Sequence, residues 1–230
     1  ECMIYNAGSK FTPAAATWVL TQNQYKFDSS SISGTVSDMD FKARGAATCV
    51  TPSGETAAWN DISIIFIKSD FNFTSAHGWN EIVGHTSGWD ASDVTEYSGE
   101  IVVTDVTDYP DTGTEMSGGG PNLNKLSNAN LLDSDAVDFT WSFNSDAKSD
   151  LSSLSTFKMA IMEYDMYYTG TYGSHHDSVA VNSASKNWER GLYIGVPDNT
   201  TTAEIPYIEY TASGGTPAVT YNATFFGTNF

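Results

Sequence analysis

Basic residues are scarce in this chain. Its 230 residues include 10 Lys+Arg against 28 Asp+Glu, which gives a formal net charge of −18 at pH 7. A surface of that sign repels phosphate backbones and removes the counterion release that supplies most nucleic-acid affinity. The composition therefore argues against a nucleic-acid partner. Because the acidic residues are spread along the chain, we interpret the charge first as a source of solubility and second as a means of cation capture.

Cysteines and long apolar runs are also lacking. Cys2 and Cys49 are the only two cysteines, too few and too far apart in sequence for a zinc site. A disulfide between them and two separate thiols both stay open. No apolar run approaches the roughly 18 residues that cross a bilayer, so we expect no membrane insertion. The chain begins with Glu1, which fits either removal of a leader or a piece of a longer protein.

The common catalytic signatures are missing as well. No GxSxG elbow, P-loop, GxGxxG or zincin motif occurs, and the 4 histidines lack the spacing of a metal site. Glu163 and Asp165 fall on one face of a predicted strand, with Tyr164 between them. We expect a strand end entering a solvent-exposed loop there, with a jelly-roll lyase or glycosidase as the weaker alternative. The sequence therefore predicts a protein that is not an enzyme.

Sequence patterns typical of β-strands are abundant in this chain. Short segments rich in β-branched and aromatic residues alternate with Gly, Ser, Asn, Asp and Pro, which predicts strands. The predicted strands are residues 18–27, 62–67, 99–106, 137–143, 157–164, 190–196 and 205–212. VDFTWSF (137–143) alternates and predicts a half-buried strand, whereas ISIIFI (62–67) does not and predicts a central strand buried on both faces. One short helix is predicted from Asp146 to Leu154, with a single turn as the alternative.

Length and spacing together predict one all-β domain. Hydrophobic residues make up 40% of the chain and aromatic residues 13%, enough for a sizeable core. We predict a two-sheet antiparallel β-sandwich over residues 1–212, with at most one or two short helices. A long Gly- and Asp-rich loop is predicted over about residues 107–135, and residues 213–230 form an aromatic C-terminal extension.

Two turn-rich segments gather aspartates, whose hard oxygen ligands suit Ca²⁺. Neither segment matches the EF-hand loop, so solvated turn residues are the first interpretation and calcium binding is the alternative. No other cofactor is expected. The candidate calcium ligands are Asp105, Asp108, Asp111, Asp133, Asp135 and Asp138.

Aromatic residues also lie in polar segments that resemble loops. Such rings either plug the ends of a sandwich, which is our first interpretation, or stack on sugars and fill protein interfaces. The candidates for a glycan or interface contact are Trp79, Trp89, Tyr167, Tyr168 and Tyr172.

Four segments in order carry a resemblance to a known family. They are GWDASDVTEYSGEI, SDLSSLSTFKMAIMEYD, RGLYIGV and PDNTTTAEIPYIEYTA. Over roughly residues 79–212 the chain resembles the jelly-roll domains of the DNRLRE type and their relatives in marine tailed-phage and metagenomic proteins. The resemblance implies a jelly-roll sandwich used as a structural, adhesive or carbohydrate-binding module on virions and secreted proteins. The aromatic extension would then pack on the same body or on a neighbouring subunit.

We therefore expect a non-enzymatic virion structural protein, namely a capsid decoration, head-fibre or tail-associated protein of a tailed bacteriophage. Its partners would be further copies of itself in a homo-oligomer, or other virion proteins. The alternative is a secreted, extracellular carbohydrate-binding module or adhesin whose partner is a surface glycan. The residues expected at an assembly interface are Tyr221, Phe225, Phe226 and Phe230.

Overall fold

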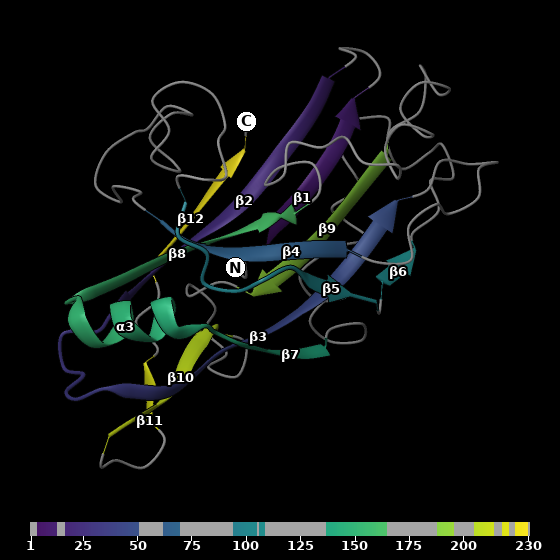
Figure 1. Ribbon diagram of the computed structural model, residues 1–230. Coiled ribbons are helices and arrows are strands. Elements are labelled where there is room, and N and C mark those ends of the chain that lie inside the picture. Colours follow the sequence, from purple (N-terminus) through teal and green to yellow (C-terminus); the bar gives the residue numbers. More distant parts are fainter. Residues whose placement is uncertain are drawn as a thin grey trace.

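The computed structural model confirms a two-layer antiparallel β-sandwich with one short helix in the part of the chain that it describes (Figure 1). Strands account for most of that part, and the helix α3 lies at one end of it. The described residues are 4–12, 17–50, 62–69, 94–104, 106–108, 137–164, 188–195, 205–213, 218–220 and 224–229.

The first layer contains five strands in the order β12-β2-β8-β4-β5, and each strand runs antiparallel to its neighbours. β2 and β8 are its longest members, and both continue past their neighbours toward α3. The strands are β12 (Thr224–Asn229), β2 (Thr17–Asp28), β8 (Thr156–Glu163), β4 (Ile62–Lys68) and β5 (Ile101–Val103).

The second layer is built on β3, a strand of 15 residues. The first half of β3 pairs with β10 and β7, and its second half pairs antiparallel with β9 and parallel with β6. β1 joins β9 to the start of β2 and so links the two layers. These strands are β3 (Val36–Val50), β10 (Tyr207–Ala212), β11 (Ala218–Thr220), β7 (Val137–Ser142), β9 (Trp188–Gly195), β6 (Val106–Asp108) and β1 (Ile4–Thr12).

An aromatic cluster joins the two layers. The Phe41 ring on β3 is fully buried, with its centroid 5.3 Å from that of Tyr25 on β2 and 5.5 Å from that of Phe66 on β4. Within its own layer the Phe41 ring stacks on Trp141 of β7 at 6.1 Å. Aromatic pairs in this distance range add about 0.5–1.5 kcal/mol each beyond the area they bury. Phe41 is therefore the residue through which the layers meet.

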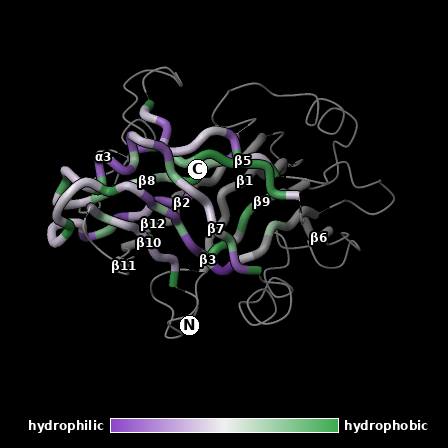
Figure 2. The backbone as a smooth tube through the Cα atoms, turned by 60° about the horizontal axis from the view of Figure 1, so that its bottom comes forward, coloured by the Kyte–Doolittle hydropathy of each residue, from purple (hydrophilic) through white to green (hydrophobic). Residues whose placement is uncertain are grey.

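Burial along two strands follows the sequence pattern. All six residues of β4 from Ile62 to Ile67 are buried, which confirms a central strand covered on both faces. In Figure 2 the tube is hydrophobic at the label of β5, the strand that pairs with β4, whereas α3 is mainly hydrophilic. On β7, Trp141 and the following Phe143 are buried, while Asp138 and the other alternate residues are exposed. The predicted half-buried strand is confirmed in its second half, whereas Val137 at its start is exposed.

The helix α3 (Ser145–Ser153) begins with a capping residue, Asn144. The Asn144 side-chain oxygen accepts hydrogen bonds from the backbone N–H groups of Asp146 (3.0 Å) and Ala147 (3.1 Å). Satisfying N–H groups in this way stabilises a helix start by about 1 kcal/mol. Ala147 and Leu151, four residues apart, are buried against the core. A nine-residue helix is therefore present, and the single-turn alternative is wrong.

Side chains of the first layer hold α3 in place. The Asp150 carboxylate on the helix accepts a hydrogen bond from the Tyr97 hydroxyl at 2.6 Å and forms an ion pair with Lys68 of β4 at 2.8 Å. The Asn144 amide also donates to the backbone oxygen of Glu96 at 2.7 Å. These contacts fix the helix at one end of the sandwich.

We expect Phe41→Ala to lower the free energy of unfolding by about 3–5 kcal/mol, because the truncation leaves a cavity between the layers. Denaturant unfolding followed by circular dichroism measures the change. Val137→Ala on β7, where the side chain is 45% exposed, serves as the control and should stay within about 0.5 kcal/mol of the parent. A Phe41→Ala loss as small as that of the control would contradict the assignment of the core.

Candidate functional site

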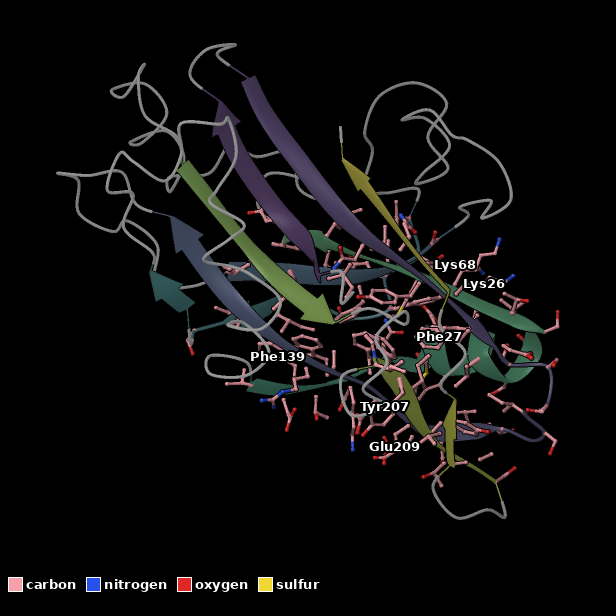
Figure 3. The ribbon with its side chains drawn as sticks, turned by 180° about the vertical axis from the view of Figure 1, so that it is seen from behind. Lys26, Phe27, Lys68, Phe139, Tyr207 and Glu209 are labelled. Atoms are coloured by element: carbon pink, nitrogen blue, oxygen red, sulfur yellow. The ribbon has the colours of Figure 1, made fainter. Side chains whose placement is uncertain are left out.

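The outer side of the second layer presents a polar face. Met39, Phe41 and Ala43 of β3 lie in the core, so the alternation of the strand turns the residues between them outward. β7 and β10 flank β3 in matching register. We define the polar face as Asp40, Lys42, Arg44, Asp138, Thr140, Ser142, Tyr207 and Glu209, and Figure 3 shows the last two together on β10.

Both cations on the polar face are paired with carboxylates. The Lys42 ammonium donates to Glu209 at 2.6 Å, and the Arg44 guanidinium donates to Asp138 at 3.1 Å. The Glu209 carboxylate raises the pKa of Lys42 above its ordinary value, against a smaller lowering by burial. Because both cations have carboxylate partners, the polar face is suited to hydrogen bonds with neutral polar groups rather than to capture of an anion.

Polar side chains are also buried inside the sandwich, away from the polar face. Asn23 on β2 is fully buried and pairs with Ile161 of β8 on one side and with Gly227 of β12 on the other. The Asn23 amide does not reach hydrogen-bonding geometry with any described residue. Glu163 at the end of β8 is also fully buried, diagonal to Asn23 on the inner face. Such diagonal neighbours are about 7–8 Å apart, within reach of long side chains.

The Tyr25 phenol lies on the same face as Asn23, two residues further along β2. Burial raises the pKa of Tyr25 well above its ordinary value of 10.0, and the nearby Asn23 side chain lowers it by a smaller amount. The folded protein therefore keeps the phenol neutral to higher pH than the unfolded chain does.

Glu163 lies in the interior and not at a solvent-exposed strand end. We predicted a strand end entering solvent, and for Glu163 this is wrong because its side chain is 0% exposed. The alternation of β8 puts Glu163 on the same face as the core residues Met159 and Ile161. Asp165, its predicted partner, lies outside the described residues. A carboxyl group in this position is not accessible to a polysaccharide substrate.

Most of the predicted aromatic contact residues lie outside the described part of the chain. This holds for Trp79, Trp89, Tyr167, Tyr168 and Tyr172, and for Tyr221 and Phe230 of the expected interface. Phe225 and Phe226 belong to β12, where they pair with Tyr25 and Gln24 of β2 in the same chain. Their role at an interface stays a prediction.

The candidate calcium ligands are not brought together by the described structure. Asp105, Asp111, Asp133 and Asp135 lie outside the described residues. Asp108 is in β6 opposite Cys49, and Asp138 forms its ion pair with Arg44 on the polar face. Within the ranges that the structure describes, no group of three or more His, Cys, Asp or Glu side chains could hold a metal ion. Calcium binding stays a prediction.

No protein-family model matches the chain, and no match to it was found among curated proteins or solved structures. The resemblance to DNRLRE-type domains is therefore untested. Among the described residues, no helix has the length and apolar character needed to cross a membrane.

The polar face was missed by the sequence analysis although its signal is local. DMDFKAR (residues 38–44) in the first half of β3 alternates polar and apolar residues, which predicts a strand with one solvent-exposed face. The pairing of this strand with β7 and β10 has no local signal, since Arg44 and Asp138 are 94 residues apart and Lys42 and Glu209 are 167 apart.

The Tyr25 environment makes stability depend on pH. Above pH 10 the unfolded chain releases the Tyr25 proton while the folded chain keeps it, so the free energy of unfolding falls as pH rises, by up to about 1.4 kcal/mol per pH unit. Tyr25→Phe removes this contribution. Urea unfolding of both proteins from about pH 9 to about pH 11 should show a steeper fall for the parent. Parallel profiles would show that the phenol is accessible to water.

Proposed function

We propose that the chain is a non-enzymatic virion structural protein, acting as a capsid decoration, head-fibre or tail-associated protein of a tailed phage. One observation supports a role in assembly above all others. In a chain with a net charge of −18, the stretch from Thr211 to Phe230 contains no Asp, Glu, Lys or Arg. Most specific interfaces are depleted in charged residues and enriched in aromatic residues at their centre, as this stretch is.

The described geometry supports this role because the described ion pairs join elements of the same fold to one another. Lys42 and Arg44 bind carboxylates across neighbouring strands, and Lys68 binds Asp150 of the helix. Glu163 is buried between the layers. The virion setting comes from the resemblance of residues 79–212 to DNRLRE-type domains. No cofactor is part of the proposal.

The proposed setting is tested on particles from the source of the sequence. Antibodies raised against the recombinant chain should label purified virus particles in immunoelectron microscopy, and peptides of the chain should sediment with those particles through a density gradient. Serum absorbed beforehand with the purified chain is the control and should leave the particles unlabelled. Recovery of the chain only from fractions without particles would refute the virion role.

The polar face favours one second candidate, a secreted carbohydrate-binding module. Tyr207 is half-buried and pairs in register with Lys42, which pairs in turn with Thr140 of β7. Aromatic rings stack on the apolar faces of sugars, and neighbouring hydroxyl and charged groups bind sugar hydroxyls. The predicted loop residues Trp79 and Trp89 would add further stacking surfaces.

A glycan array with the purified chain tests the second candidate. Binding to neutral glycans should fall roughly tenfold or more for Tyr207→Ala and stay close to the parent for Tyr207→Phe, which keeps the ring. Trp89→Ala separates a loop site from the polar face, because it should leave binding at that face unchanged. Absence of binding across the array would remove this candidate and leave the assembly role.

A further inference from the structure

The described sheet edges differ in how well they are protected against pairing with another chain. A free edge presents unpaired N–H and C=O groups, and natural proteins limit the risk with short strands, charged side chains or proline. β5, β6 and β11 have 3 residues each. β7 has 6 residues and carries the exposed Asp138.

β12 has none of these protections. It is 6 residues long, with the sequence TFFGTN, and contains neither a charge nor proline. Among the described strands it pairs with β2 alone, from Thr224 opposite Lys26 to Asn229 opposite Thr21. One side of its backbone is therefore used within the chain, and the other side is an edge of the first layer as far as the described strands show.

Electrostatics also directs contact between copies to this edge. Two molecules with a net charge of −18 repel each other over most of their surfaces. The stretch from Thr211 to Phe230 carries no charge, and the residues of β2 paired with β12 carry only that of Lys26. Repulsion between two copies is therefore weak where β12 meets β12.

We propose that β12 pairs antiparallel with β12 of a second copy across a two-fold axis. The first layers of the two copies then form one continuous sheet through a self-complementary contact, which is the usual form of a symmetric dimer. The inference rests on the proposed assembly role and identifies β12 as the strand through which two copies meet. A second copy is the favoured partner because its β12 is uncharged as well. Two negatively charged molecules can therefore approach each other at these edges.

Sedimentation equilibrium of the full chain tests the dimer. The 24.9 kDa chain should sediment at about twice its own mass at micromolar concentration, as expected for a specific contact. Thr228→Lys adds a gatekeeping lysine to β12 opposite Gln22, and should weaken dimerisation roughly tenfold or more. This substitution lowers the net negative charge, so a general charge effect would strengthen association instead.

Val102→Lys on β5 is the matched control, because the charge change is the same and Val102 is 50% exposed on another edge strand. It should leave the dimer intact. A monomeric parent chain, equal weakening by both substitutions, or an unaffected Thr228→Lys dimer would each overturn the inference. A chain that binds an unrelated protein through β12 while staying monomeric alone would overturn it too.

Hydrogen exchange of the parent chain keeps the test decisive if Thr228→Lys fails to fold. Exchange of the amides in Thr224–Asn229 should slow as the chain is concentrated, because outer N–H groups gain partners, while exchange in β5 stays constant. Exchange that does not depend on concentration would refute the contact. Labelling of virus particles is a separate result, so failure of the dimer leaves the proposed virion role standing.

Discussion

The contact of Phe41 with Tyr25 and Phe66 is the constraint on which the rest of the structure depends. It joins the second layer to the first through rings that are fully buried. Once Phe41 points inward, the period of a strand fixes the direction of its neighbours. Lys42 and the other polar residues of β3 must then face solvent, where they meet β7 and β10 to form the polar face.

The same constraint separates the interior from the surfaces that are available to partners. Asn23 and Glu163 lie between the layers, so they influence stability and not recognition. The polar face and the outer edge of β12 are two surfaces that the described strands present to other molecules. Of these, the polar face has its cations paired internally, whereas β12 offers backbone groups on a strand without charge. This difference is the reason for proposing assembly through the edge of β12.

Local pattern was enough to predict much of the fold. The apolar run of β4 indicated a strand buried on both faces, and a short helix was expected near residues 146–154; the structure confirms both. β3 was missed because charged residues occupy every second position and hid its apolar partners. The placement of Glu163 was also wrong, because alternation shows which residues share a face and not which face is covered. Pairing between distant strands depends on contacts that no local window contains.

The most direct measurement is a double-mutant cycle between Phe41 and Phe66, whose rings lie 5.5 Å apart on different layers. Denaturant unfolding of the parent, Phe41→Leu, Phe66→Leu and the double variant gives the coupling free energy. If the layers are joined as described, the coupling is favourable by about 0.5–1.5 kcal/mol. Additive effects of the two substitutions would mean that these rings do not meet, and the polar face and the β12 edge would then lose their structural basis.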